Sequence, residues 1–310
     1  MSIPETRIGQ VLRSQSGQYW VRSRDGGIFH CTLRGRFKRG RRARTDLVVI
    51  GDVVRLSLLE GAEGEGVIEG IEPRRNRFSR RQPGPRGRFK EDVLVANVDW
   101  IFAVFACARP AMNPRVLDRF LVEAELDAID AAIVANKVDL VDDRAARSAF
   151  EPYARLGYPV FYTSVTEGRG VEEVRAHAAC GISAFVGPSG VGKSSLLNAL
   201  EPGLGLAVAS VSETLDKGRH TTRVAELHPL SGGGWVADTP GIREIVSFEL
   251  PTEKLAWCFR EMRPLLGQCR FPDCVHDHEP DCAVRDAVAR GEIAAARYDS
   301  YLRILRDEER

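Results

Sequence analysis

Short apolar runs separated by turn residues dominate the first seventy positions of the chain. Strands are predicted over residues 6–12, 18–23, 28–33, 48–50, 52–59 and 66–71, and turns rich in Gly, Asp and Arg separate them. No helical period interrupts these runs, and strands of this length and spacing are typical of a small barrel. The pattern therefore predicts an N-terminal five-stranded barrel of the OB type.

From about residue 92 the pattern changes to apolar strands that alternate with helical stretches. Strands over 100–107, 131–135, 159–163 and 182–186 alternate with helices over 114–126, 144–155 and 171–178. This alternation predicts a parallel, doubly wound α/β sheet. After about residue 247 the chain becomes helical around a cysteine cluster. We therefore expect a barrel over 1–72, a basic linker over 73–91, an α/β domain over 92–247 and a helical domain over 248–310.

Length and composition agree with a multidomain globular chain. A chain of 310 residues is longer than a single hydrophobic core usually organises. Its composition, with 44% hydrophobic and 28% charged residues, disfavours disorder and coiled coils. The longest apolar run, Trp100 to Ala108, is too short to span a membrane, and the N-terminus lacks the apolar core of a signal peptide. Seven cysteines in an unexported chain favour reduced thiols and metal binding. We expect a cytoplasmic protein without a membrane partner.

The net charge of +1 conceals a strong asymmetry. Residues 1–90 hold 20 Lys and Arg against 9 Asp and Glu, a net of +11, which leaves 24 against 34, a net of −10, for the rest. A basic loop carries seven of these cations: Arg34, Arg36, Lys38, Arg39, Arg41, Arg42 and Arg44. We expect this loop to contact nucleic-acid phosphates, the alternative being a solvated charge run. A second basic run, Pro73 to Lys90, is rich in Pro and Gly and predicts an extended linker.

A phosphate-binding loop follows the strand that ends at Val186. The sequence from Gly187 to Ser194 fits the pattern G-x-x-x-x-G-K-[ST] between a strand and a helix over 195–200. Lys193 is expected to reach the β and γ oxygens and Ser194 to ligate Mg²⁺. The rest of the predicted phosphate cradle is the loop and the helix start: Gly187, Pro188, Ser189, Gly190, Val191, Gly192 and Ser195.

The tetrapeptide Asn136-Lys-Val-Asp139 predicts a guanine base. It follows a buried strand, so it lies at the carboxyl edge of the sheet, where ligands bind in such folds. Asp139 can accept from both N1–H and the N2 amine of guanine, which adenine lacks. Asn136 is expected to bond the Hoogsteen edge, and the Lys137 stem to cover the face of the base. Ser164, Val165 and neighbouring amides are a candidate third base contact.

Two further polar segments complete the nucleotide site. Asp238-Thr-Pro-Gly241 ends a short strand, so Asp238 is expected to hold a Mg²⁺ water and the Gly241 amide to sense the γ-phosphate. The segment from Lys217 to Arg223 is a candidate first switch, in which Thr221 or Thr222 offers a hydroxyl to Mg²⁺.

A cluster of soft ligands near the C-terminus predicts one structural zinc. Within fourteen residues the chain offers Cys269, Cys274, His276 and Cys282, and Cys₃His is a standard tetrahedral zinc set. His278 is a competing ligand. The remaining cysteines lie in apolar surroundings and are expected to fill core: Cys31, Cys107, Cys180 and Cys258.

The order of the nucleotide motifs is rotated, with both base motifs before the phosphate loop and the switches. The chain thus resembles the circularly permuted GTPases and, with its barrel and cysteine cluster, the small-ribosomal-subunit-dependent GTPase A family. That resemblance implies a monomer that hydrolyses GTP with Mg²⁺, binds the small ribosomal subunit and its rRNA, and acts late in subunit maturation.

The resemblance also implies catalytic residues. Many GTPases orient the attacking water with a glutamine after the second-switch glycine, but this chain has Ile242, which cannot form a hydrogen bond. The resemblance assigns that role to His220, with Lys193 and Thr222 as the other catalytic residues. The alternative is that His220 packs or contacts RNA.

Two other functions compete with a subunit-stimulated GTPase. In the first, the chain is an RNA-binding assembly factor, GTP stabilises its binding-competent state, and hydrolysis is incidental. In the second it is a metabolic P-loop kinase, but a kinase has no use for Asn136 and Asp139.

Overall fold

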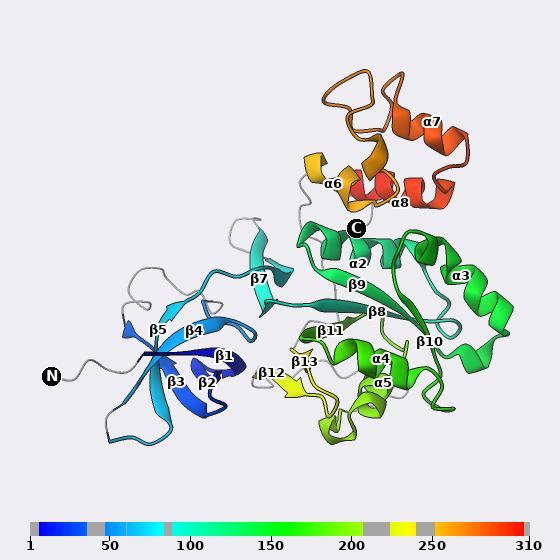
Figure 1. Cartoon of the computed structure of the whole chain (residues 1–310). Coiled ribbons are helices and arrows are strands. Elements are labelled where there is room, and N and C mark those ends of the chain that lie inside the picture. The colour runs from blue at the N-terminus through cyan, green and yellow to red at the C-terminus, as the bar shows by residue number, and fades with distance from the viewer. Residues whose placement is uncertain are drawn as a thin grey trace.

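The computed structural model describes residues 6–35, 47–59, 61–83, 89–206, 224–239 and 252–306. A barrel lies at one end of the molecule and an α/β part at the other, with a small helical part on one flank of the α/β part (Figure 1). Among the described residues, every helix is too short or too polar to cross a bilayer.

Five strands form the N-terminal barrel. They are β1 (Thr6–Gln15), β2 (Gln18–Ser23), β3 (Ile28–Leu33), β4 (Val53–Leu58) and β5 (Glu65–Ile71). The order is β1-β2-β3-β5-β4, and pairing of β1 with β4 closes the barrel. Alternate apolar side chains such as Val11, Val21 and Leu56 fill its core. The five-stranded barrel is confirmed, but the expected strand over 48–50 is reduced to one bridge, between Ile50 and Val95.

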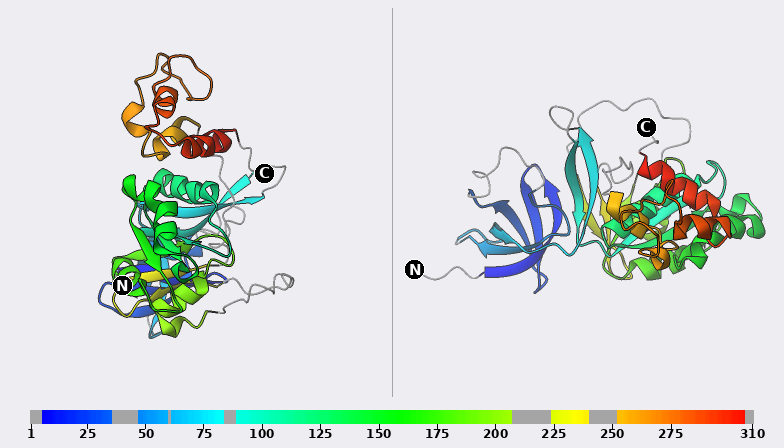
Figure 2. Two further views of the ribbon diagram at one scale, coloured as in Figure 1. Left: turned by 90° about the vertical axis from the view of Figure 1, so that its right-hand side faces the viewer. Right: turned by 90° about the horizontal axis from the view of Figure 1, so that it is seen from above.

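The segment expected as an extended linker is largely a β-ribbon. Strand β6 (Arg77–Pro83) pairs antiparallel with β7 (Phe89–Ala96), and Figure 2 shows the ribbon standing between the barrel and the α/β part. Phe78 and Leu94 are buried in the α/β core, and Arg80 forms a 2.7 Å ion pair with Asp92. Apolar residues at the ribbon's base stabilise it, whereas its Arg, Pro and Gly content predicted an unpaired segment.

The central sheet is doubly wound, as predicted. Its strands, in spatial order, are β10 (Val160–Thr163), β9 (Asp130–Asn136), β8 (Trp100–Ala106), β11 (Ile182–Val186), β13 (Trp235–Asp238) and β12 (Val224–Pro229). All neighbours pair in parallel except β12, which is antiparallel to β13. One face packs against α2 (Pro114–Leu126) and α3 (Asp143–Arg155), and the other against α4 (Val171–Ala178) and α5 (Lys193–Leu200).

The barrel and the central sheet share an edge. Strand β1 pairs antiparallel with β12, with Arg13 opposite Glu226 and Gln15 opposite Val224. The two sheets therefore form one eleven-stranded sheet through the junction. This contact joins segments about two hundred residues apart, so local sequence patterns do not predict it.

The helical part docks on α2 through apolar and charged contacts. Its helices are α6 (Thr252–Cys258), α7 (Ala283–Ala289) and α8 (Ala295–Leu305). Val122 of α2 joins their core. Beside it, Arg297 of α8 is 5% exposed and pairs with Asp118 of α2 at 2.5 Å and with Glu261 at 2.7 Å. The Tyr153 hydroxyl donates to Asp118 at 2.8 Å.

A second carboxylate on α2 holds two more arginines. Glu125 accepts from Arg260 at 2.6 Å, from Arg263 at 2.5 Å and from the Tyr158 hydroxyl at 2.9 Å. Burial alone would raise the pKa of Glu125, but the bonds from Arg263 and Arg260 hold it below its usual value. Asp118 and Glu125 are seven residues apart, so two helical turns place both on one side of α2.

Arg297→Ala should lower the free energy of unfolding by about 3–5 kcal/mol, because it leaves two buried carboxylates without their cation. Urea unfolding of the zinc-loaded full chain, followed by circular dichroism, measures this loss. Arg303→Ala is the matched control: its pair with Asp299 is 35% and 46% exposed, so a loss of at most about 0.5 kcal/mol is expected. Equal unfolding midpoints for the two variants would contradict a stabilising role for the Arg297 network.

Candidate functional site

The phosphate-loop sequence lies between β11 and α5, at the carboxyl edge of the sheet. Three of its glycines adopt positive φ: Gly187 (142°), Gly190 (79°) and Gly192 (96°). A Cβ on Gly187 would lie 2.2 Å from the carbonyl oxygen of Val104 in β8, so the loop approaches the neighbouring strand more closely than any side chain allows. The glycines therefore fix the path of the loop.

Lys193 begins α5 and folds back over this loop. Its side chain is buried, and its Nζ donates to the carbonyl oxygens of Gly187 at 2.6 Å and Pro188 at 2.5 Å. Ser194 and Ser195 follow in the first turn, where backbone N–H groups have no partner within the helix and favour an anion. A cation and free helix amides at one loop are suited to phosphate.

Asn136, at the end of β9, is 2% exposed and links three segments. Its Nδ2 donates to the carbonyl oxygen of Val191 in the phosphate loop at 2.9 Å, and its Oδ1 accepts from the Thr163 hydroxyl at 2.9 Å. One Nδ2 hydrogen remains for a base. Asn136 thus has a structural role that the sequence interpretation missed, and Thr163, also absent from the predicted site, holds its carboxamide.

Lys137 connects the same strand end to the phosphate loop. Its backbone is left-handed (φ 61°), and its Nζ donates to the carbonyl oxygens of Arg109 and Gly190, both at 2.6 Å. Asp139 follows in the short 3₁₀ turn Val138–Leu140 and is exposed. The structure therefore brings the base tetrapeptide and the phosphate loop together.

Ser164 and Val165 follow β10 at the same edge. The buried Ser164 hydroxyl is 2.9 Å from that of Thr166 and accepts from the Glu167 amide at 3.3 Å. It thus closes its own turn, which leaves the turn's backbone rather than this hydroxyl to meet a ligand. Asp238 ends β13, next to β11, and pairs in register with Glu226.

Several predicted residues lie outside the described residues. They are His220, Thr221, Thr222, Gly241, Arg36, Lys38, Arg39, Arg41, Arg42 and Arg44. Of the basic loop, Arg34 is described and forms an ion pair with Glu69.

The cysteine cluster has the geometry of a tetrahedral metal site. His276 Nδ1 lies 3.5, 3.4 and 3.4 Å from the sulfurs of Cys269, Cys274 and Cys282, and the sulfurs of Cys269 and Cys282 are 3.8 Å apart. A zinc tetrahedron with ordinary bond lengths has S···S edges of about 3.8 Å and S···N edges of about 3.6 Å. These four residues, the predicted set, therefore fit a zinc ion.

Neighbouring groups hold the ligand loop in place. The Glu279 carboxylate accepts from the amides of Val275, Asp277 and His278 at 2.9, 3.0 and 3.2 Å. Although burial opposes ionisation, these bonds lower the pKa of Glu279 to about 2. The Tyr298 hydroxyl donates to the His276 carbonyl at 2.6 Å. The competing ligand His278 is 83% exposed and does not join the cluster.

The other cysteines divide between core and surface. Cys31 and Cys258 are buried, as predicted, and burial raises the pKa of each thiol to about 12. Cys107 is half-buried, and burial followed by the charge of Asp139 raises its pKa to about 11. The prediction was wrong for Cys180, which is exposed just before β11 because it ends a turn rather than occupying a strand.

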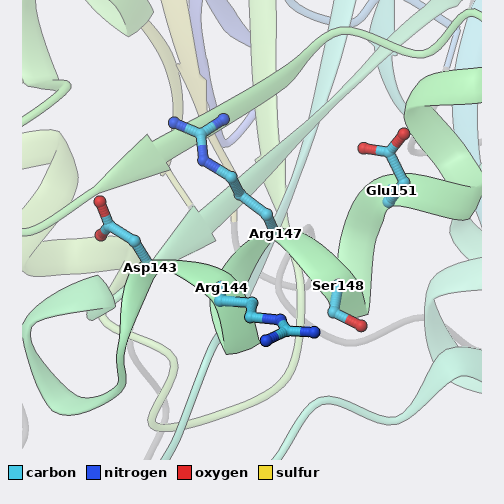
Figure 3. A pocket seen from close by; sticks show the side chains of 5 residues that line it. All are labelled: Asp143, Arg144, Arg147, Ser148 and Glu151. Atoms are coloured by element: carbon cyan, nitrogen blue, oxygen red, sulfur yellow. The ribbon is translucent and has the colours of Figure 1, made fainter.

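A separate cavity of about 450 Å³ lies along α3 (Figure 3). It is lined by Asp143, Arg144, Arg147, Ser148 and Glu151. None of these is a predicted site residue.

Comparison with known proteins identifies the family. Residues 71–248 match the model of the RsgA GTPase, and residues 8–68 match that of the RsgA N-terminal domain. The chain belongs to the RsgA family. It is therefore a GTPase that uses Mg²⁺ with GTP. We call the carboxyl edge of the sheet that carries the phosphate loop and residues 136–139 the nucleotide edge.

Relatives of this family match almost the whole chain. The small ribosomal subunit biogenesis GTPase RsgA of Gemmatimonas aurantiaca is 46% identical over 300 residues, covering 97% of this chain and 96% of the relative. The protein of that name from Moorella thermoacetica is 42% identical and covers 96% of both chains.

Two solved structures share the fold. YjeQ from Thermotoga maritima superposes with a TM-score of 0.79 at 34% identity over 98% of both chains. YloQ, described as a circularly permuted GTPase, gives 0.74 at 30% identity over 98% of this chain and 95% of its own. The barrel predicted from the short strands and the circularly permuted GTPase fold predicted from the motif order are both confirmed.

Cys274→Ser should reduce bound zinc from about one equivalent to below about 0.2 while GDP affinity changes less than about twofold, because a structural site stabilises its own small domain. Metal analysis and GDP titration of the purified chain measure both quantities. Cys180→Ser, at an exposed cysteine outside the cluster, should retain full zinc. Equal zinc content in both variants would rule out the Cys₃His site.

Proposed function

We propose that this RsgA-family GTPase binds the small ribosomal subunit and acts late in its maturation, with GTP hydrolysis stimulated by the subunit and driving release or licensing. The observation that carries this proposal is the full-length match to relatives named small ribosomal subunit biogenesis GTPases. The basic N-terminal third, with its net charge of +11, is suited to rRNA. We propose a monomer that works in the cytoplasm.

We propose that different residues of the nucleotide edge bind the base and the phosphates of GTP. Asp139 reads guanine, and Lys137 covers the base while its Nζ is held by two carbonyl oxygens. Lys193 stabilises the γ-phosphate. The proposed Mg²⁺ ligands, direct or through water, are Ser194, Asp238 and one of Thr221 and Thr222. Asn136 supports this edge because it ties β9 to the phosphate loop.

Water activation is proposed for the first switch. Ile242 stands where many GTPases have a water-orienting glutamine. His220 can donate and accept hydrogen bonds near neutral pH. In this proposal the subunit stimulates hydrolysis by placing His220 beside the γ-phosphate.

We propose that the barrel part (1–72) and the helical part (248–310) contact the subunit on either side of the GTPase part (92–247). Arg34 pairs with Glu69, so the rRNA contacts of the basic loop are assigned chiefly to its other cations: Arg36, Lys38, Arg39, Arg41, Arg42 and Arg44.

An RNA-binding assembly factor in which hydrolysis is incidental is the alternative. Multiple-turnover hydrolysis measured with and without purified small subunits separates the two functions. A clear increase in the rate with subunits supports the proposal, and an unchanged rate with intact subunit binding supports the alternative.

Asp139→Asn should transfer preference from guanine to xanthine nucleotides, because a carboxamide can donate to the extra oxygen of xanthine but cannot accept from both donors of guanine. The loss for GDP should be about a hundredfold or more. Competition between GDP and XDP measures the change. Asp143→Asn, at an exposed aspartate on α3, is the control and should keep the parent's preference. Tight GDP binding by Asp139→Asn would refute the guanine assignment.

His220→Ala should keep GTP affinity within a few-fold but reduce subunit-stimulated hydrolysis by about a hundredfold. The neutral imidazole is the active form, so the parent's stimulated rate should fall as pH decreases through about 6.5, and the variant should lose that pH dependence. The rate of GTP hydrolysis, measured at roughly pH 5.5 to 8 with saturating subunits, reports both effects. Parental rates in the variant, with subunit binding intact, would remove His220 from catalysis.

A further inference from the structure

A row of cationic and aromatic side chains crosses the outer face of the barrel. Arg13 of β1 lies opposite Trp20 of β2, which lies opposite His30 of β3. The Arg13 guanidinium is 4.7 Å from the centre of the Trp20 ring, and the rings of Trp20 and His30 are 4.9 Å apart. His30 is exposed, and Arg13 and Trp20 are half-buried.

This row is not part of the barrel core. The side chains directly before and after Trp20 on β2, those of Tyr19 and Val21, belong to the barrel core and are buried. Because successive residues of a strand point to opposite faces, the large ring of Trp20 lies on the outer side. A tryptophan on a solvent face of a barrel calls for a role other than core packing.

The row continues across the junction onto the GTPase sheet. Arg22, two residues after Trp20 on β2, is exposed, and its guanidinium lies 5.5 Å from the ring centre of Trp235 in β13. Pairing of β1 with β12 makes this continuity possible, and Figure 1 shows the barrel strands beside β12 and β13. We call Arg13, Trp20, Arg22, His30 and Trp235 the stacking row.

Charge places limits on what the row can bind. Two carboxylates flank it: Glu226, 3.9 Å from Arg13, and Glu65, opposite His30. Between these carboxylates the row carries the ring of Trp20, with the cation of Arg22 beside it on β2. This combination suits a ligand with flat, uncharged π faces on an anionic backbone.

We infer that the stacking row binds single-stranded RNA by stacking unpaired bases, an inference that rests on the proposed binding of the ribosomal subunit. Trp and His rings and Arg guanidinium planes stack on bases, and each stacked base contributes about 1–3 kcal/mol. Bases of a duplex already stack on one another, so the row selects unpaired segments. This surface is separate from the basic loop, which is suited to phosphates.

The test uses the full zinc-loaded chain with two fluorescein-labelled probes, a 12-nucleotide oligouridine and a 12-base-pair RNA duplex. The parent should bind the single strand more tightly than the duplex at the same salt concentration. Two of the four tryptophans lie in the row, so oligouridine should also quench the intrinsic fluorescence. His30→Ala should weaken oligouridine binding about fivefold or more, the loss of one stacked base.

Arg22→Gln and Arg55→Gln form a matched pair. Both remove one exposed cation from a barrel strand, but Arg55 is on β4 and pairs with Glu72. Arg22→Gln should weaken oligouridine binding about fivefold or more, whereas Arg55→Gln should weaken it less than about twofold. Circular dichroism verifies that each variant keeps the barrel.

Any one of three results would contradict RNA binding by the stacking row. These are equal affinity for the single strand and the duplex, parental oligouridine affinity in His30→Ala, and equal losses of oligouridine affinity in Arg22→Gln and Arg55→Gln. Subunit-stimulated hydrolysis is measured on the same preparations. If subunits stimulate GTP hydrolysis by the parent but the oligouridine binding results are not as expected, the RNA-binding role of the row is wrong and the proposed function stands. If the parent neither binds subunits nor responds to them, the proposed function itself is wrong.

Discussion

The nucleotide edge depends on one buried carboxamide. Asn136 ends β9, donates to the phosphate loop through Val191 and accepts from Thr163 at the end of β10. These two hydrogen bonds link the end of β9 to the phosphate loop and to the end of β10. Without them, the spacing between the base and phosphate positions would no longer be fixed. Because the three partners are close in space but distant in sequence, a permuted chain order leaves the arrangement intact.

The small helical part is stabilised in two different ways. Inside it, the Cys₃His cluster holds a loop that has few apolar side chains of its own. Outside it, Asp118 of α2 pairs with the buried Arg297, and Glu125 of α2 pairs with the half-buried Arg260 and Arg263. The attraction within such a buried pair roughly offsets the desolvation of its two charges, but removing one partner leaves an uncompensated charge and is costly. These pairs therefore fix the orientation of the zinc-binding part on the GTPase part.

Local patterns were sufficient for the barrel, the alternating sheet, the phosphate loop and the zinc ligands, because each depends on residues close together in the sequence. They failed where distant segments decide the outcome. The ribbon of β6 and β7 is stabilised by Phe78 and Leu94 in a remote core, and the union of β1 with β12 leaves no local signal. The structural role of Asn136 was likewise not predicted, because its two buried partners belong to other loops.

The union of the barrel with β12 has a mechanical consequence. Strand β12 starts directly after the segment with Thr221 and Thr222, and β13 ends directly before the segment with Gly241. Both segments thus leave the same end of one hairpin, where Glu226 faces Asp238, and Gln15 of the barrel pairs with Val224 at that end. Because β1 pairs with β12, a displacement of the barrel moves the hairpin of β12 and β13. Such a displacement therefore reaches the starting points of both segments together.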